Sequence, residues 1–379
     1  MSCLIERVEV FCFRVPIKTP VATSFGVMRD RPAVFVKLTD EQGAFGWGEI
    51  FANWPAAAAE HRAQLLLQDI CDLVVGHRVE QAGDLFEQLS KKTYIRAIQS
   101  GEWGPFRQVI AGLDIALHDL YARRMGLSLA QFLNKNSAMA VPTYASGIAI
   151  GVALDLIAQA RVAGHDAFKV KIGFDGARDL AALRKVSENL KSDEYLMADV
   201  NQAWSVEEAL SFAFEIDALD LSWLEEPIQA DLPTSDWAKL AASYKTPLAG
   251  GENIAGFSDF NDVLLAKHLS VIQPDIVKWG GLSGCAAVAQ KACAEGLRYC
   301  PHFLGGGIGL IASAHLLAAI GGDGLLEVDV NPNPLRDAFG GAKTRNDGWF
   351  PISTASGLGI ELLPEELSQF QTLTLEARA

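Results

Sequence analysis

Two lysines stand two residues apart in the apolar run FKVKI at residues 168–172. If this run is a strand, Lys169 and Lys171 lie on the same face of the sheet and point into one cavity. Each ammonium group would then lower the pKa of the other, because a neighbouring like charge disfavours the charged form. A lysine with a lowered pKa can act as a general base near neutral pH. The alternative for these residues alone is a solvent-facing edge strand with two ordinary lysines.

Acidic residues end three of the later apolar runs: Asp199, Glu225 and Glu252, which are 26 and 27 residues apart. Carboxylates that converge on one point repel each other unless a divalent cation neutralises them. An all-oxygen ligand set with open positions suits Mg²⁺, which keeps water or substrate oxygens as its other ligands. The alternative is that each acid caps the helix that follows it. The regular spacing of three such acids favours the metal site.

Two further runs end in Gln273-Pro274-Asp275 and in Cys300-Pro301-His302. A buried aspartate beside an imidazole fixes its tautomer and raises its basicity, so His302 is a candidate for a second base. The alternative is a core histidine with a satisfied hydrogen bond. Glu327 ends the last run, where a structural salt bridge competes with a catalytic role.

In strand order these residues form a lysine base, a metal site and a histidine base, and a substrate on the metal would lie between the two bases. This arrangement fits abstraction of a proton alpha to a carboxylate. The resulting enediolate carries charge on oxygens that a metal and Lys169 can hold.

The elements that must position these residues repeat a strand-then-helix pattern in the second part of the chain. Such a series without an internal break predicts a closed parallel barrel, in which the chemistry lies at the C-terminal ends of the strands. The eight expected strands begin at Val141, Ala167, Tyr195, Ser222, Pro247, Ser270, Arg298 and Gly324.

The first part of the chain has a different pattern. Apolar residues alternate over residues 8–15, 32–38 and 43–49, which predicts a small antiparallel sheet. Residues 19–30 would form a long loop between the first two strands, and loops of that length are often functional. Helical spacing follows over residues 56–124. Polar residues near 133–140 suggest a boundary, which gives two domains, 1–135 and 136–379.

Composition restricts the class of protein. The formal net charge of -14 and the pI near 5.0 argue against nucleic acid and an anionic membrane as partners, since both require a basic surface. Residues 1–10 alternate apolar and charged side chains, unlike a signal peptide. Residues 305–322 are uncharged, but their glycines and His315 favour a loop and a buried helix over a membrane span. The six cysteines form no Cys-x-x-Cys pair. We therefore expect an acidic cytoplasmic enzyme with free thiols.

The motifs taken together, in order and over nearly the whole chain, resemble the enolase superfamily in its mandelate racemase subgroup. They are the strand end Trp47-Gly48-Glu49, the helix GLDIALHD at residues 112–119, and the Lys-x-Lys, Asp-x-Asn, Glu-Glu-Pro, Gly-Glu-Asn and Asp-with-His motifs of the barrel. The resemblance implies an α/β fold, a modified (β/α)7β TIM barrel with an α+β N-terminal capping domain to which the last residues return. It also implies Mg²⁺ on Asp199, Glu225 and Glu252.

The resemblance further implies a role for each of the remaining residues. Lys171 would be one base, and Lys169 would lie beside the substrate carboxylate. His302, assisted by Asp275, would be the second base or the acid, and Glu327 would donate a hydrogen bond to the carboxylate. The loops at 19–30 and 51–56 would cap the barrel mouth. The substrate-binding candidates are Thr23, Phe25, Trp54, Tyr144 and Asn201.

The expected reaction is Mg²⁺-dependent abstraction of the α proton, followed by dehydration of an acid sugar or cycloisomerisation of an aldarolactone. Residues 326–336 are similar to those of galactarolactone cycloisomerases, and Asp275 with His302 argues against muconate cycloisomerase or dipeptide epimerase activity. The alternatives are a racemase or epimerase of a 2-hydroxy acid, a metal-dependent aldolase and a non-catalytic ligand-binding barrel. We expect a small-molecule carboxylate substrate and a homo-oligomer, an octamer or a dimer, with neither nucleic acid nor a membrane as a partner.

Overall fold

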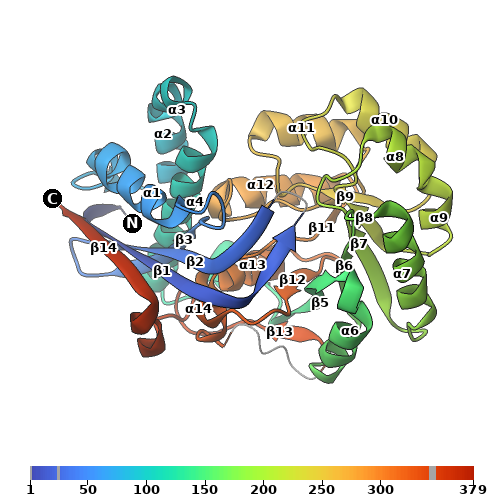
Figure 1. Cartoon of the computed structure of the whole chain (residues 1–379). Coiled ribbons are helices and arrows are strands. Elements are labelled where there is room, and N and C mark those ends of the chain that lie inside the picture. The colour runs from blue at the N-terminus through green and yellow to red at the C-terminus, as the bar shows by residue number, and fades with distance from the viewer. Residues whose placement is uncertain (1, 24–25, 341–346) are drawn as a thin grey trace.

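The computed structural model describes residues 2–23, 26–340 and 347–379, and in residues 18–23 it describes the backbone alone. Two sheets organise the chain: an antiparallel sheet at one end of the molecule and a parallel barrel at the other (Figure 1). Both chain termini lie beside the antiparallel sheet, because the last strand returns to it (Figure 1).

The antiparallel sheet has the strand order β14-β1-β2-β3, and a short strand, β4, pairs with β1. Helix α4 packs against it closely: a Cβ atom on Gly46 would lie 2.0 Å from the carbonyl oxygen of Ala116, so only glycine allows this approach. The strands are β1 (Cys3–Thr23), β2 (Gly26–Asp40), β3 (Phe45–Ile50), β4 (Arg78–Val79) and β14 (Gln371–Arg378).

The prediction of a loop over residues 19–30 is wrong. β1 and β2 continue as a hairpin through most of it, with Val21 opposite Met28 and Thr23 opposite Gly26. The pairing register shifts between Pro16 and Val21, and this irregularity interrupts the alternation that identifies a strand in sequence. Figure 1 shows the two long strands bending from the sheet toward the barrel. The hairpin therefore brings capping residues to the barrel mouth.

Helices fill the rest of the capping part, as the spacing over residues 56–124 predicts. Gly101 ends α3 in the left-handed conformation, with φ 72°, and α4 begins two residues later. The helices are α1 (Ala58–Leu65), α2 (Asp84–Lys92), α3 (Tyr94–Ser100), α4 (Trp103–Arg124) and α5 (Leu129–Leu133), with single turns at Leu66–Ile70 and Cys71–Leu73.

The parallel sheet has the order β11-β10-β9-β8-β7-β6-β5-β12, and β13 pairs with β5. Its ends meet where the Leu325 amide lies 3.4 Å from Cys300 Sγ. All eight strands begin within two residues of the predicted positions. They are β5 (Ala140–Ala149), β6 (Ala167–Lys171), β7 (Tyr195–Asp199), β8 (Trp223–Glu225), β9 (Leu248–Gly250), β10 (Val271–Ile272), β11 (Arg298–Tyr299) and β12 (Leu326–Asp329), with β13 at Trp349–Pro351.

Helical segments connect each strand to the next, so seven strand–helix units precede the last strand, β12. This confirms the predicted (β/α)7β barrel with an antiparallel N-terminal sheet. Among the helices in the described parts of the chain, none has both the length and the apolar character needed to cross a membrane. The barrel helices are α6 (Ala153–Val162), α7 (Gly176–Glu188), α8 (Val206–Ser211), α9 (Ala213–Asp217), α10 (Thr234–Ser243), α11 (Phe257–Ala266), α12 (Gly281–Ala294) and α13 (Gly307–Ile320), followed by α14 (Pro334–Asp337).

Glu49 joins the capping sheet to the barrel. Its carboxylate accepts hydrogen bonds from the backbone amides of Gly306 and Gly309, at the N-terminus of α13, over 2.5 and 2.8 Å. A helix N-terminus favours negative charge. Burial nevertheless raises the pKa of Glu49 to about 7. This contact lies four residues after His302, so it holds the capping sheet against a strand end that carries a candidate base.

Candidate active site

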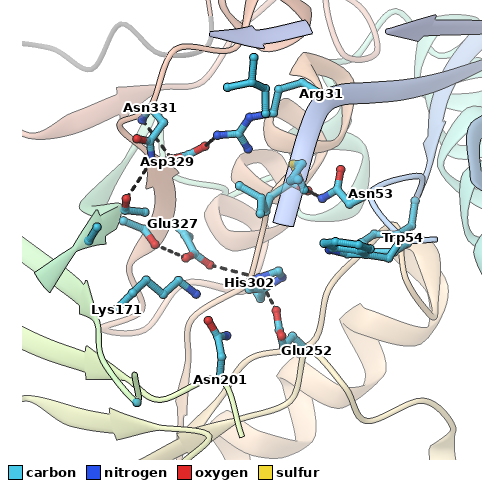
Figure 2. A pocket seen from close by; sticks show the side chains of 18 of the residues that line it. Arg31, Asn53, Trp54, Lys171, Asn201, Glu252, His302, Glu327, Asp329 and Asn331 are labelled. Atoms are coloured by element: carbon cyan, nitrogen blue, oxygen red, sulfur yellow. Dashed lines mark hydrogen bonds and ion pairs between the residues drawn. The ribbon is translucent and has the colours of Figure 1, made fainter. Parts of the chain in front are cut away.

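A cavity of about 1820 Å³ opens at the C-terminal ends of the barrel strands. Residues of both parts of the chain line it (Figure 2). Asn53 and Trp54 come from the segment after β3, and Asn53 Nδ2 donates to the Leu304 carbonyl oxygen over 2.6 Å. The predicted contribution of residues 51–56 to the barrel mouth is therefore present. The barrel lining includes Lys171, Asn201, Glu252, His302 and Glu327.

Strand β6 places Lys169 and Lys171 on one side, as the two-residue spacing predicts. Lys169 is fully buried, and its Nζ lies 2.6 Å from Glu225 Oε1 and 2.8 Å from Glu327 Oε1. Lys171 lines the cavity, and its Nζ lies 2.5 Å from Asp199 Oδ2. Of these two lysines, Lys171 is the one that can reach a substrate in the cavity.

Lys169 lowers the pKa of Lys171, as expected, but the expectation of a lowered net pKa for these lysines is wrong. Burial lowers the pKa of Lys171, but the charge of Asp199 raises it, and the result lies above its ordinary value. Burial likewise lowers the pKa of Lys169, while Glu225 and Glu327 raise it well above the ordinary value. The neighbouring lysine has the predicted sign, but the carboxylates outweigh it.

The three candidate metal ligands stand on successive strands. Asp199 of β7 pairs in register with Glu225 of β8, and Glu252 follows the end of β9. Yet among the described residues no three His, Cys, Asp or Glu side chains are gathered as a ligand set. Glu225 accepts from Gln273 Nε2 over 2.7 Å and from Trp223 Nε1 over 3.1 Å, in addition to its contact with Lys169. Glu252 instead contacts His302.

A side-chain nitrogen lies against each of the three carboxylates: Lys171 against Asp199, Lys169 against Glu225 and His302 against Glu252. Their chemistry still fits Mg²⁺: each is an oxygen donor, and all three stand at the C-terminal ends of neighbouring strands.

The structure brings Asp275 and His302 together, as their positions in the sequence predict. His302 Nδ1 lies 2.7 Å from Asp275 Oδ2, and His302 Nε2 contacts Glu252. Burial lowers the pKa of His302, but Glu252, Glu327 and Asp275 together raise it well above its ordinary value. Each nitrogen of the imidazole thus has a carboxylate beside it.

Glu327 accepts hydrogen bonds in this structure, and its expected role as a hydrogen-bond donor to a substrate stays a prediction. Burial raises the pKa of Glu327, but the charges of Lys169 and His302 lower it to about 2. An ionised carboxylate only accepts hydrogen bonds. Glu327 accepts from Ser146 Oγ over 2.5 Å and from the Phe303 amide over 3.1 Å.

The substrate-binding candidates fall into three groups. Trp54 and Asn201 line the cavity, and the backbone amide of Asn201 donates to Asp199 Oδ1 over 2.8 Å. Tyr144 does not reach the cavity: it is fully buried in the barrel interior, where its ring packs edge-on against Trp223. Its place in the substrate-binding set is a misassignment: Tyr144 is the fifth of the ten residues of β5, and its ring belongs to the layers of side chains that fill the barrel. The side chain of Thr23 and all of Phe25 lie outside the described residues.

Several polar residues at the site were missed in the sequence. Gln273, which bonds to Glu225, lies two residues before Asp275, so the period of a strand could have identified it. Lys278 lines the cavity and donates to Asn253 Oδ1 over 2.8 Å. Arg31 and Asp329 also line it, and no local pattern connects two residues so far apart in the chain.

Comparison with known proteins places this site in a family. The chain matches the mandelate racemase/muconate lactonizing enzyme N-terminal domain over residues 6–134 and the enolase C-terminal domain-like family over residues 153–366. It is 45% identical to a protein from Bordetella bronchiseptica RB50 whose crystal structure is described as mandelate racemase/muconate lactonizing enzyme, with a TM-score of 0.91 over 97% of this chain and 99% of that one.

Characterised relatives are more distant. D-galactarolactone cycloisomerase of Agrobacterium fabrum is 27% identical over 94% of this chain and 95% of its own. The structure of L-talarate/galactarate dehydratase from Salmonella typhimurium LT2 with Mg and L-lyxarohydroxamate is 26% identical, with a TM-score of 0.82 over 100% of this chain and 95% of that one. Because both parts of the fold match along nearly the whole length, this protein is an enzyme of the mandelate racemase/muconate lactonizing enzyme family, within the enolase superfamily.

Proposed function

We propose that this enzyme uses Mg²⁺ to abstract the proton alpha to the carboxylate of a sugar acid, and that dehydration of the acid or cycloisomerisation of its lactone follows. The observation that carries the proposal is that Lys171 of β6 and His302 after β11 face one cavity (Figure 2), and that Asp275 after β10 holds His302 from behind. Two proton-transfer groups from different strands of a barrel can act on different faces of one bound carbon.

In this proposal Asp199, Glu225 and Glu252 hold Mg²⁺, which supplies a Lewis acid for the substrate carboxylate. Asp199 and Glu252 raise the pKa of Lys171 and His302, and Mg²⁺ on these carboxylates would offset that effect, so that Lys171 Nζ or His302 Nε2 in its neutral form would accept the α proton. In a dehydration, the other group protonates the departing hydroxyl group, which leaves as water. Asp275 orients the imidazole, because its Oδ1 is itself held by the backbone amides of Val277 and Lys278 over 2.9 and 3.1 Å.

The names of two relatives support the choice of reaction, since one is a cycloisomerase of a sugar lactone and the other a dehydratase of sugar acids. Magnesium in the dehydratase crystals supports the choice of metal. The size of the cavity is compatible with a sugar acid, since its volume of about 1820 Å³ is larger than such a ligand needs. Within the site, Asn201 and Trp54 contact the substrate.

Racemisation or epimerisation of a 2-hydroxy acid is the second candidate. It is favoured by the same pair of proton-transfer groups, because a racemase removes a proton on one face and returns one on the other. The product distinguishes the two: racemisation conserves the substrate's formula, whereas dehydration forms a 2-keto-3-deoxy acid and water.

The test is a panel of sugar acids and lactones incubated with the enzyme and Mg²⁺ in deuterium oxide and followed by NMR. We expect loss of the α-proton signal with at least one acid, and none after chelation of the metal. Lys171→Ala should abolish exchange for one configuration at the α carbon and His302→Asn for the other. No exchange with any acid would contradict the proposal. Loss of exchange for both configurations of the α carbon in either variant would mean that one base serves both faces.

A further inference from the structure

Strand β12 extends from the candidate proton-transfer groups to the outer part of the cavity. Glu327 contacts Lys169 and the Phe303 amide. Asp329 lies two residues further on the same side of the strand, which places it about 6–7 Å nearer the cavity mouth. There it meets Arg31, which reaches across from β2 of the capping sheet (Figure 2). A ligand held at Lys171 would present its far end to this outer wall.

We define the outer wall as Arg31, Asp329 and Asn331, which all line the cavity. Arg31 Nη2 lies 3.0 Å from Asp329 Oδ2, and their side chains are 5% and 4% exposed. Asn331 Nδ2 donates to Asp329 Oδ1 over 2.7 Å and to the Gly147 carbonyl oxygen over 2.8 Å. Gly147 has φ 75°, and a Cβ atom there would lie 2.2 Å from Asp329 Oδ1, so the backbone leaves room for the carboxylate.

The charges of this wall cancel. Arg336 lies behind it and donates to the Asp329 carbonyl oxygen over 2.6 Å, and its guanidinium lies 2.7 Å from Asp337 Oδ1 and 3.6 Å from Asp329 Oδ2, so two arginines face two carboxylates. Arg31 is matched by Asp329. Among the described residues that line the cavity, the other cations are Lys171, which faces Asp199, and Lys278, whose charge lowers the pKa of Glu252. Arg31 and Lys171 thus each have a carboxylate at ion-pair distance, while Lys278 Nζ donates to Asn253 Oδ1.

The wall also has unused hydrogen-bonding capacity. Within the described residues, Arg31 Nε is buried and has no acceptor. Asp329 Oδ2 forms ion pairs with Arg31 Nη2 at 3.0 Å and with Arg336 Nη1 at 3.6 Å, but it accepts no hydrogen bond of good geometry from the described part of the chain. A buried donor without an acceptor is unfavourable unless a ligand satisfies it, and a carboxylate oxygen has lone pairs for a further donor. A hydroxyl group suits both, because its oxygen accepts a hydrogen bond while its hydrogen is donated. A second carboxylate has no proton to give Asp329, and the two negative charges would repel each other.

We propose that the outer wall binds an uncharged, hydroxyl-bearing end of the substrate, so that the substrate of this enzyme is a monocarboxylate, either an open-chain sugar monoacid or a lactone with one free carboxylate. This inference rests on the proposed function and deepens it. Arg31 and Asp329 then determine substrate specificity. A monoacid places an uncharged hydroxyl group against the outer wall, whereas a diacid places a second carboxylate there.

The experiment compares two sugar acids of the same hydroxyl configuration, one with a single terminal carboxylate and one with two. The readout is the ratio of their kcat/KM values with Mg²⁺, or the ratio of their α-deuterium exchange rates where turnover is slow. For the unmodified enzyme we expect the monoacid to be favoured by at least about tenfold, which corresponds to about 1.4 kcal/mol.

Two substitutions should move this ratio in opposite directions. Asp329→Asn keeps the shape of the side chain and leaves Arg31 uncompensated, so the ratio should shift toward the diacid by about tenfold. Arg31→Met leaves the carboxylate of Asp329 less compensated, so the diacid should be rejected more strongly. Asp231→Asn is the matched control: it removes one acid from the exposed rim of the cavity, and screening by water and salt should keep its effect below about twofold.

Circular dichroism establishes whether each variant is folded. If Asp329→Asn does not fold, the substrate ratio of Arg31→Met is used to test the inference. A preference of the unmodified enzyme for the diacid overturns the inference while leaving the proposed function intact. So does a ratio that neither substitution changes, especially with lower stability, because the ion pair would then only fasten the capping sheet to the barrel. Absence of exchange with every acid overturns the proposed function, and this inference with it.

Discussion

His302 Nδ1 lies 2.7 Å from Asp275 Oδ2, at the point where the ends of β10 and β11 are joined by an isolated bridge. The second oxygen of Asp275 is occupied by two backbone amides, so the carboxylate has no freedom to turn away. The imidazole is thereby fixed with Nε2 directed to the cavity side, where it contacts Glu252. This pair makes the orientation of His302 independent of the substrate.

Asp275→Asn should therefore act through His302. An asparagine can hold the wrong tautomer and does not stabilise the imidazolium, so exchange of the α proton on the histidine side should fall about 10- to 100-fold. Exchange on the Lys171 side should continue. Deuterium incorporation into each enantiomer of an enolisable substrate analogue measures both. Asp262→Asn, at an exposed position of α11, is the control, and unimpaired exchange in Asp275→Asn would exclude the positioning role.

Glu225→Gln tests the metal site. Loss of one carboxylate ligand should weaken Mg²⁺ binding by at least about tenfold and abolish turnover, because hard cations prefer charged oxygen donors. Isothermal titration calorimetry measures the affinity, and circular dichroism checks the fold, since Glu225 also faces the buried Lys169.

The control for this substitution is Glu207→Gln, at an exposed position of α8 and outside the proposed ligand set. Its replacement should leave Mg²⁺ affinity unchanged. Equal affinity in the Glu225 variant and the unmodified enzyme would require a different ligand set.

Trp54→Ala tests the contribution of the capping part to substrate binding. The indole lines the cavity and packs against Gly26 of the β1–β2 hairpin, where a Cβ atom would lie 2.7 Å from it. Loss of this aromatic surface should raise KM by about tenfold without changing Mg²⁺ affinity. Trp349→Ala, on β13, is the control. An unchanged KM would exclude Trp54 from the binding site.

Glu49 should make the stability of the protein depend on pH. Burial raises the pKa of Glu49 from 4.5 to about 7, so the folded protein binds this proton more tightly than the unfolded chain does. The resulting stabilisation is complete below pH 4.5 and is lost as the pH rises to about 7. Relative to Glu49→Gln, the unmodified protein should lose up to about 3 kcal/mol of unfolding free energy across this range.

Denaturant unfolding at a series of pH values measures this difference. The exposed Glu366→Gln variant should follow the unmodified protein at every pH. A constant difference between Glu49→Gln and the unmodified protein would show that Glu49 does not titrate in this range.

Much of the barrel can be predicted from local pattern. The strand starts, the Lys-x-Lys spacing and the acids after β7, β8 and β9 all follow from the period of a strand and from the repeat of strand and helix. These features depend on residues close together in the chain. The pairing of Asp275 with His302 follows as well, because successive strands of a parallel barrel bring their C-terminal ends to one rim.

The protonation of the site depends on residues that no local pattern brings together. The pKa of Lys169 is raised because Glu225 and Glu327 come from two other strands, and the pKa of Glu327 is lowered by Lys169 in turn. Charge and burial are set by the sum of all neighbours in space, whereas periodicity reports only which side chains share a face. For the same reason the contact between Arg31 of the capping sheet and Asp329 of the barrel could be found only in the folded molecule.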